Sequence, residues 1–244
     1  MDKGNIYVYS GTGNCLAIAK QIAAELDLEV IKITAELAAE KISVDCDRAV
    51  IIYPTYAYGI PKTARKFVKS ANWNVKYLAV LTSIGSHHGG SLAECIRLLK
   101  RKGQKTAYSN AVRSVENYVH LFGWPSEKKI ELRCSQQKEK TAKVIIDIKE
   151  QKTNKRILFR PESCFVSLIL RGAVLLLAKR YRAAKNCTGC GICRRVCPAN
   201  AISIKDGKRK VKVCSKKCDH CQACLMLCPS KALRYGRITP KSRR

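Results

Sequence analysis

Residues 187–198 read CTGCGICRRVCP, and residues 218–229 read CDHCQACLMLCP. Both stretches place four cysteines at positions i, i+3, i+6 and i+10, and a proline follows the fourth cysteine in each. Nine of the 14 cysteines lie between residues 187 and 228, whereas the other five are scattered singly. The chain therefore contains an internal repeat of one specific cysteine spacing, confined to its C-terminal part.

This spacing is typical of iron–sulfur chemistry. Three closely spaced thiolates can bind three corners of a 4Fe-4S cube, and in two-cluster proteins the cysteine before proline binds the other cluster. On this rule, the ligands of one cluster are Cys187, Cys190, Cys193 and Cys228. The ligands of the other are Cys218, Cys221, Cys224 and Cys197. A pair of zinc sites is the alternative, but zinc usually takes two pairs of cysteines and does not need these triplets.

The segment 185–244 resembles the bacterial two-cluster ferredoxins. The resemblance implies a small α+β domain that transfers single electrons at low potential. Gly189 and Gly191 would let backbone amides approach the cluster sulfurs, and such hydrogen bonds tune the potential. Cys214 has no counterpart in the first repeat and is expected to be a free thiol.

The N-terminal part alternates short apolar strands with helices. Residues 5–9 (NIYVY) predict a strand, residues 10–14 (SGTGN) a glycine turn, and residues 15–26 a helix. Further strands are expected at 28–33, 48–53, 77–83 and 105–112, and helices at 61–71, 90–102 and 127–151. Continuous apolar strands separated by helices indicate an α/β fold, a doubly wound parallel sheet covered on both faces.

The glycine turn predicts an anion site, because it ends a strand and opens a helix. It lacks the motifs that bind NAD or ATP. It resembles the phosphate loop of the flavodoxins, with Cys15 in place of the family's final threonine. The resemblance implies strand order 2-1-3-4-5 and an FMN whose phosphate is held by Ser10, Gly11, Thr12, Gly13 and Asn14.

Two further loops follow strands at the carboxyl edge of the sheet, where ligands of open α/β sheets bind. They are residues 54–61 and 82–90, and the candidate flavin contacts in them are Thr55, Tyr56, Tyr58, Gly59, Ser83 and Gly85. The pair His87 and His88 is expected to face solvent or the cofactor, not a metal. Asn117 and Tyr118 resemble a flavodoxin-like segment that either packs or contacts FMN.

The order of modules resembles a family of flavodoxin–ferredoxin fusion proteins of anaerobic microbes. It implies a flavodoxin-like FMN-binding domain at 1–152, a basic linker with an apolar helix near 162–182 within 153–184, and the ferredoxin domain at 185–244. No secretory signal opens the sequence, so we expect a cytoplasmic location, where thiols stay reduced. The apolar stretch 164–178 is too short to cross a bilayer, which leaves a packed helix or a membrane-surface helix.

The formal charge of +29 is concentrated near the cysteines, where residues 185–244 hold 16 Lys and Arg against two acids. A basic rim around a cluster would attract an acidic redox partner, such as a ferredoxin or an oxidoreductase. Nucleic acid or an anionic membrane would also be attracted. No aromatic base-reading platform accompanies the charge, which disfavours nucleic acid.

Three functions follow from these features. The favoured one is electron transfer, with single electrons passing through the two clusters to or from FMN. The second is an FMN-dependent reductase fed by the clusters, that is, an FMN/iron-sulfur oxidoreductase. The third is a protein with structural clusters that binds nucleic acid or a membrane surface. No side-chain acid or base stands out as a catalytic group.

Overall fold

The computed structural model describes residues 4–154, 166–167, 169–170, 172, 180–204 and 211–236. Its larger part is a five-stranded sheet in the order β2-β1-β3-β4-β5, and every neighbouring pair of strands is parallel. The strands are β1 (Gly4–Val8), β2 (Glu29–Lys32), β3 (Ser43–Pro54), β4 (Asn72–Ile84) and β5 (Tyr108–Arg113). This order confirms the predicted flavodoxin-like sheet.

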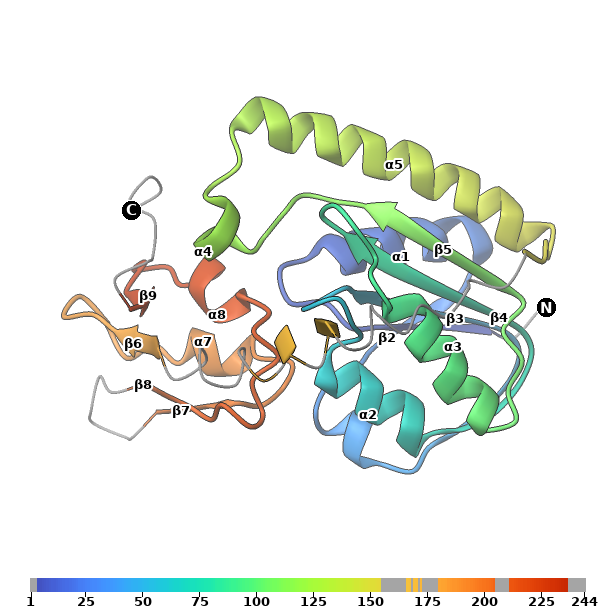
Figure 1. The fold of residues 1–244 in the computed structure, drawn as a ribbon, viewed down its shortest axis with the longest axis horizontal. Coiled ribbons are helices and arrows are strands. Elements are labelled where there is room, and N and C mark those ends of the chain that lie inside the picture. The colour runs from blue at the N-terminus through green and yellow to red at the C-terminus, as the bar shows by residue number, and fades with distance from the viewer. Residues whose placement is uncertain are drawn as a thin grey trace.

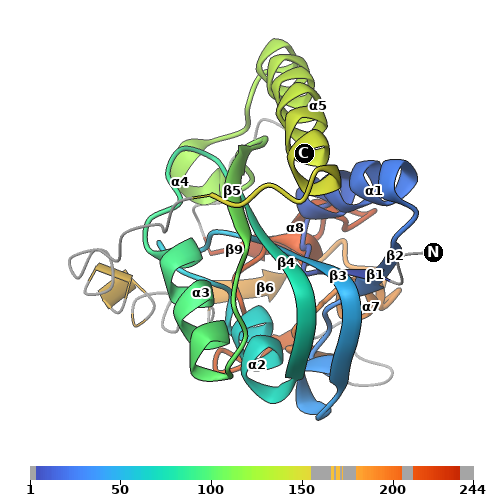
Figure 2. The same ribbon diagram turned by 90° about the vertical axis from the view of Figure 1, so that its right-hand side faces the viewer.

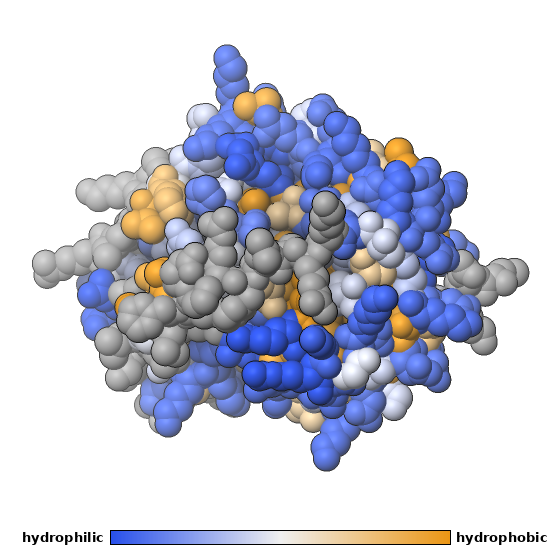
Figure 3. Space-filling view, turned by 45° about the vertical axis from the view of Figure 1, so that its right-hand side comes forward, coloured by the Kyte–Doolittle hydropathy of each residue, from blue (hydrophilic) through white to orange (hydrophobic). Residues whose placement is uncertain are grey.

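Helices cover both faces of this sheet (Figure 2). They are α1 (Asn14–Leu26), α2 (Lys62–Ser70), α3 (Ser91–Arg101) and α5 (Glu127–Lys149). Residues 50–53 are all fully buried; Val50 and Ile52 pack with α1 and α5, whereas Ile51 and Tyr53 pack with α2 and α3. Successive side chains of a strand point to opposite faces, so this apolar run fills two cores. Hydrophilic side chains cover most of the described surface seen in Figure 3.

The central strands are longer than predicted. β3 and β4 pair from Ser43 and Asn72 onward, several residues before the expected starts at 48 and 77. In the first residues of β3, buried and exposed residues alternate, as in the buried Val44 and the exposed Asp45. Only the continuous apolar runs indicated a buried strand, so the half-buried extensions were missed. Two short helices, η1 (Leu37–Ala39) and α4 (Val119–Phe122), were also not predicted.

The C-terminal module contains two antiparallel strand pairs. β6 (Tyr181–Ala183) pairs with β9 (Leu233–Tyr235), and β7 (Ile202–Ile204) pairs with β8 (Val211–Val213). Two short helices, α7 (Ile192–Arg195) and α8 (Ala223–Met226), lie inside the two cysteine repeats. The module is therefore a small α+β unit built twice over.

The predicted helix near 162–182 needs a correction at its end, because Tyr181 begins strand β6. Most of that helix, and most of the apolar stretch 164–178, lies outside the described residues. Since Tyr181 pairs with Tyr235, we propose that the cysteine-rich module begins by Tyr181 and not at residue 185.

Among the helices that the structure describes, none has both the length and the apolar character needed to cross a membrane.

The cysteine-rich module packs against the carboxyl edge of the parallel sheet (Figure 1). The backbone N–H of Ala35 donates to the Pro198 carbonyl at 2.8 Å, and the Asn200 side chain donates to Glu36 at 2.9 Å. Lys62 Nζ reaches the Lys216 carbonyl at 3.2 Å. These contacts hold the module at this edge of the sheet through residues at the end of the first cysteine repeat and just before the second.

Candidate functional site

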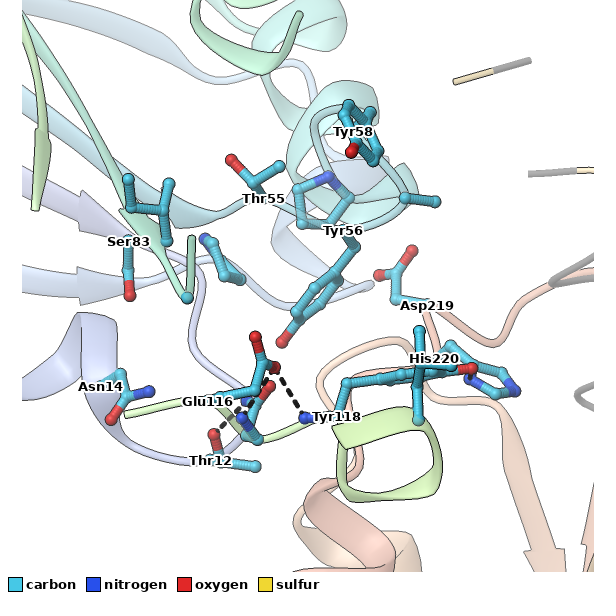
Figure 4. A pocket seen from close by; sticks show the side chains of 18 of the residues that line it. Thr12, Asn14, Thr55, Tyr56, Tyr58, Ser83, Glu116, Tyr118, Asp219 and His220 are labelled. Atoms are coloured by element: carbon cyan, nitrogen blue, oxygen red, sulfur yellow. Dashed lines mark hydrogen bonds between the residues drawn. The ribbon is translucent and has the colours of Figure 1, made fainter. Parts of the chain in front are cut away.

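A cavity of about 680 Å³ lies at this edge, between the sheet and the cysteine-rich module (Figure 4). Nine of the 11 predicted flavin contacts line it: Ser10, Gly11, Thr12, Asn14, Thr55, Tyr56, Tyr58, Ser83 and Gly85. Gly13 and Gly59 do not line it and instead shape its walls, Gly13 by capping α1 with φ 103° and Gly59 by closing a turn. The fold thus gathers three loops that are distant in sequence around one space.

The first loop is held together by its own polar side chains. Ser10 Oγ accepts hydrogen bonds from the backbone N–H groups of Gly13 at 3.2 Å and Leu16 at 3.3 Å. Thr12 Oγ1 accepts one from Asn117 Nδ2 at 2.6 Å, and Asn14 Nδ2 donates to the Val115 carbonyl at 2.8 Å. The loop is therefore fixed at the N-terminus of the 13-residue helix α1, where backbone N–H groups and the helix dipole favour an anion.

Gly11 has a second role that its sequence context did not indicate. A Cβ atom at this position would lie 2.6 Å from the Cβ of Cys221 and 3.0 Å from its sulfur. Because real Cβ atoms do not approach other carbons so closely, only glycine allows this contact. The phosphate-type loop and the second cysteine repeat are thus in direct van der Waals contact.

The second loop contains a strained tight turn. Tyr56 and Gly59 exchange two backbone hydrogen bonds of 3.0 and 2.9 Å, and Ala57 and Tyr58 between them have φ values of 47° and 61°. Non-glycine residues with positive φ cost about 1–2 kcal/mol each, and such strain is found at functional sites. The turn leaves Tyr56 half-buried and packed against the core, and burial raises the pKa of its hydroxyl well above 10. Tyr58 is 43% exposed at the mouth of the cavity.

Hydroxyl groups tie the strand ends together at the cavity floor. Thr55 Oγ1 lies 3.0 Å from Thr82 Oγ1 and 2.7 Å from Ser91 Oγ. Ser83 Oγ donates to Ser114 Oγ at 2.8 Å. These hydrogen bonds join the ends of β3 and β4 to Ser91 at the start of α3 and to Ser114 just after β5.

Glu116 is a cavity residue that the sequence did not predict. Its Oε1 accepts hydrogen bonds from the backbone N–H groups of Asn117 at 3.0 Å and Tyr118 at 2.9 Å. Its other oxygen occupies the space that a Cβ of Gly85 would need. Gly85 therefore makes room for a carboxylate in the cavity wall. His87 also lines the cavity, whereas His88 hydrogen-bonds the Gly89 carbonyl.

Cys15, which replaces the threonine of the flavodoxin loop, packs under the loop and is only 1% exposed. Burial raises the pKa of its thiol to about 12, partly offset by hydrogen bonds with Ser83. Burial likewise raises the pKa of Cys95 to about 12. Both residues are therefore neutral thiols near neutral pH.

We expect iodoacetamide at about pH 8 to alkylate Cys134 and Cys214 in the folded protein but to spare Cys15 and Cys95. The first two are exposed, whereas a pKa raised to about 12 leaves roughly one thiolate in ten thousand at this pH. Mass spectrometry of timed samples measures the order, and the urea-unfolded chain is the control in which all four react. Early labelling of Cys15 in the folded protein would contradict its assignment as buried.

The cysteines of the repeats line two small cavities. One is lined by Cys197, Cys218, Cys221 and Cys224, and the other by Cys187, Cys190, Cys193 and Cys228. This division is the same as the two crossed ligand sets predicted from the spacing. Burial raises the pKa of Cys218 to about 11, and metal binding would offset this penalty, because coordination removes the thiol proton.

Asp219 and His220, between two cysteines of the second repeat, complete the cavity (Figure 4). Asp219 Oδ2 accepts hydrogen bonds from Tyr9 Oη at 2.9 Å and from the Thr63 backbone N–H at 3.2 Å. Burial raises the pKa of this carboxyl group. His220 Nδ1 lies 3.2 Å from Tyr118 Oη. The two residues thus join the cysteine repeat to β1, α2 and the segment before α4.

An aromatic cluster closes the far side of the cavity. The His120 ring stacks on Tyr235 with centroids 4.0 Å apart, and Tyr181 contacts both Tyr235 and His220. Burial lowers the pKa of His120 to about 4, so this ring is neutral near neutral pH. No sequence pattern indicated this cluster, because its four members come from four separate segments of the chain.

One comparison with protein families matches the cysteine-rich part of the chain. Residues 186–232 match the model of a family described as a 4Fe-4S dicluster domain. No curated protein matches the chain. The chain thus joins a flavodoxin-like sheet, defined by its strand order, to a 4Fe-4S dicluster segment.

Several solved structures are similar to the N-terminal part. A flavodoxin of Streptococcus pneumonia TIGR4 has 22% identity and a TM-score of 0.35, covering 58% of this chain and 98% of its own. The two-electron reduced flavodoxin of Megasphaera elsdenii has 16% identity and a TM-score of 0.33, covering 57% and 98%. A flavoprotein of Lactobacillus acidophilus NCFM in complex with FMN has 14% identity and a TM-score of 0.36, covering 46% and 93%.

Proposed function

We propose that the protein transfers electrons between two 4Fe-4S clusters and an FMN. One observation carries this proposal: the second cysteine repeat forms part of the wall of the cavity that the phosphate-type loop opens into. Cys221 touches Gly11, and the neighbouring Asp219 and His220 line the cavity itself. A redox centre on these cysteines would lie beside a ligand bound in the cavity.

The residues present fit both cofactors. The eight cysteines of the two repeats would hold the clusters in crossed sets, and the clusters would supply one-electron transfer. The loop at residues 10–14 would hold the FMN phosphate, and Tyr56, Tyr58 and Gly85 would flank the flavin ring. Bound FMN supplies a group that can exchange two electrons, one at a time. Cys15 is a buried residue of α1, so Thr12 and the backbone amides of the loop would hold the phosphate.

The charge of the module supports an acidic redox partner. In residues 180–204 and 211–236, ten exposed Lys and Arg accompany one acidic residue, the buried Asp219. Such a surface attracts a negatively charged protein and raises the rate of encounter at low salt. An acidic ferredoxin or oxidoreductase is the partner we propose. A cytoplasmic site and a role in anaerobic metabolism belong to the same proposal, because thiols and clusters need reducing conditions.

The basic test is iron, sulfide, zinc and flavin analysis of anaerobically purified protein. The proposal requires two clusters and one FMN for each chain, whereas zinc in place of iron would contradict it.

Thr12→Val tests the phosphate loop. We expect the variant to bind FMN about tenfold more weakly, because it loses a hydroxyl hydrogen bond worth about 1.5 kcal/mol near a charged group. Riboflavin, which lacks the phosphate, is the matched ligand and should bind both proteins equally. Flavin fluorescence titration measures both affinities. Equal FMN affinity for variant and parent would exclude Thr12 from the phosphate site.

A second candidate function is a reductase, favoured by the apolar rim of the cavity. Leu121 and Phe122 are 71% and 61% exposed and line its mouth. A small apolar acceptor could rest there beside the flavin. Steady turnover of a small quinone by FMN-loaded protein, without any protein acceptor, would favour this function over electron carriage.

A further inference from the structure

The two cysteine sets differ in exposure. In the set of Cys197, three of the four cysteines are buried: Cys218 is 9% exposed, Cys221 8% and Cys224 9%. In the other set Cys190 is exposed, and its three companions, Cys187, Cys193 and Cys228, are half-buried. We call the set of Cys197, Cys218, Cys221 and Cys224 the inner set, and the set of Cys187, Cys190, Cys193 and Cys228 the outer set.

The inner set touches the flavodoxin-like domain. Cys221 lies against Gly11 with no room for a Cβ between them. Asp219 binds Tyr9 and Thr63 through its carboxylate, and His220 binds Tyr118. Within the described residues, the loop between Cys218 and Cys221 therefore contacts the phosphate-type loop, α2 and the segment before α4 at once.

The outer set faces a basic surface. Lys185, Arg194 and Lys231 are exposed and lie within three residues of Cys187, Cys193 and Cys228, respectively. The guanidinium group of Arg195, also exposed, donates a hydrogen bond of 3.1 Å to the Cys190 carbonyl. The described part of this module has no exposed acid that would neutralise these charges.

We propose that the two clusters have different, fixed partners, an inference that rests on the proposed function. The cluster of the inner set exchanges electrons with the flavin. The cluster of the outer set exchanges them with an acidic one-electron carrier that docks over Cys190. When the flavin takes up two electrons, two carrier molecules each give up one electron, and solvent supplies the protons. In the reverse direction the electrons follow the same path.

The physical reason is distance. Electron transfer between redox centres slows steeply as their separation grows, so each exchange uses the nearer cluster. The cysteine that contacts the phosphate-type loop belongs to the inner set, and the exposed cysteine belongs to the outer set. A carrier docked at the inner set would have to displace the flavodoxin-like domain.

The first test measures the ³¹P NMR line of bound FMN in the variants Cys190→Ala and Cys221→Ala. Each variant removes the second cysteine of one repeat. After dithionite reduction, a nearby cluster broadens the ³¹P resonance through its unpaired electron. We expect broadening in the parent and in Cys190→Ala, and a sharp line in Cys221→Ala. Broadening that is lost in Cys190→Ala but retained in Cys221→Ala would overturn the proposal.

The second test needs no flavin. A water-soluble dysprosium chelate speeds the electron-spin relaxation of reduced clusters near the surface. We expect a strong effect on the outer-set cluster, which remains in Cys221→Ala, and a weak effect on the inner-set cluster, which remains in Cys190→Ala. Equal effects would contradict the proposed difference in exposure between the two clusters. If Cys221→Ala loses both clusters, Cys224→Ala serves instead, because it removes another ligand of the inner set and leaves the phosphate-type loop unchanged; Cys193→Ala is its match in the outer set.

The two tests separate the proposals. Protein that gives no ³¹P resonance of bound FMN contradicts the proposed function. Protein that binds FMN and eight irons but shows the wrong cluster near the phosphate contradicts only the division of roles.

Discussion

Asp219→Ala is expected to speed hydrogen exchange of the Thr63 amide by a factor of about 30 to 1,000. In the parent, the Asp219 carboxylate accepts hydrogen bonds from Thr63 N–H and Tyr9 Oη, and all three groups are buried. Alanine leaves both donors without this partner, which costs about 2–4 kcal/mol in total, and each 1.4 kcal/mol is a factor of ten. Exchange followed by mass spectrometry of peptides that contain Thr63 measures the change.

Asp219→Asn is the matched control, because its amide oxygen can still accept both hydrogen bonds. We expect its exchange rate to stay within about tenfold of the parent, since only the charge contribution is lost. Asp45→Ala removes an exposed carboxylate that binds only Asn74 among the described residues, and should not change the Thr63 amide. Equal rates in Asp219→Ala and the parent, at equal iron content, would show that this carboxylate does not hold the module in place.

The fold could be predicted because its decisive features are local. The runs at residues 49–53 and 77–81 are apolar without interruption, which is typical of a strand buried on both faces. The extensions of β3 and β4 alternate polar and apolar residues, and their pairing begins at Ser43 and Asn72. This alternation is itself typical of a half-buried strand, but the prediction used only the continuous apolar runs and therefore missed the extensions.

The cavity loops could be predicted for a topological reason. Carboxyl ends of parallel strands meet at one edge of the sheet, so the loops after β1, β3 and β4 had to lie close together. The structure does place them around one cavity. Their individual roles toward FMN stay a prediction until FMN binding is measured.

The contacts between the two modules could not be predicted. Tyr9 and Asp219 are 210 positions apart, and nothing in the repeat marks Asp219 or His220 as different from ordinary spacers. Glu116 directly precedes Asn117 and Tyr118, whose resemblance to a flavodoxin-like segment pointed to this loop but not to a carboxylate in the cavity wall. Gly11 was predicted for a correct local reason, the glycine turn, but its contact with Cys221 depends on how the modules pack. Such long-range contacts are fixed by tertiary packing and leave no local pattern.

Charge reversal at the outer set is expected to slow association with an acidic carrier by about 10- to 100-fold at about 0.1 M salt. The variant Lys185→Glu/Arg194→Glu replaces two exposed positive charges near Cys187 and Cys193 with negative ones. Charges at the rim of an interface act mainly on the rate of encounter. Stopped-flow mixing with a reduced acidic two-cluster ferredoxin measures this rate.

The matched control is Lys138→Glu/Lys143→Glu on α5, which changes the net charge equally at exposed positions over the parallel sheet (Figure 1). It should keep at least about a third of the parent rate, because charges more than a Debye length from the docking face, about 10 Å at 0.1 M salt, are largely screened. For the same reason, the difference between the two variants should shrink at about 0.5 M salt. Equal slowing by both variants would mean that net charge alone attracts the carrier, and that the surface around Cys190 is not its docking site.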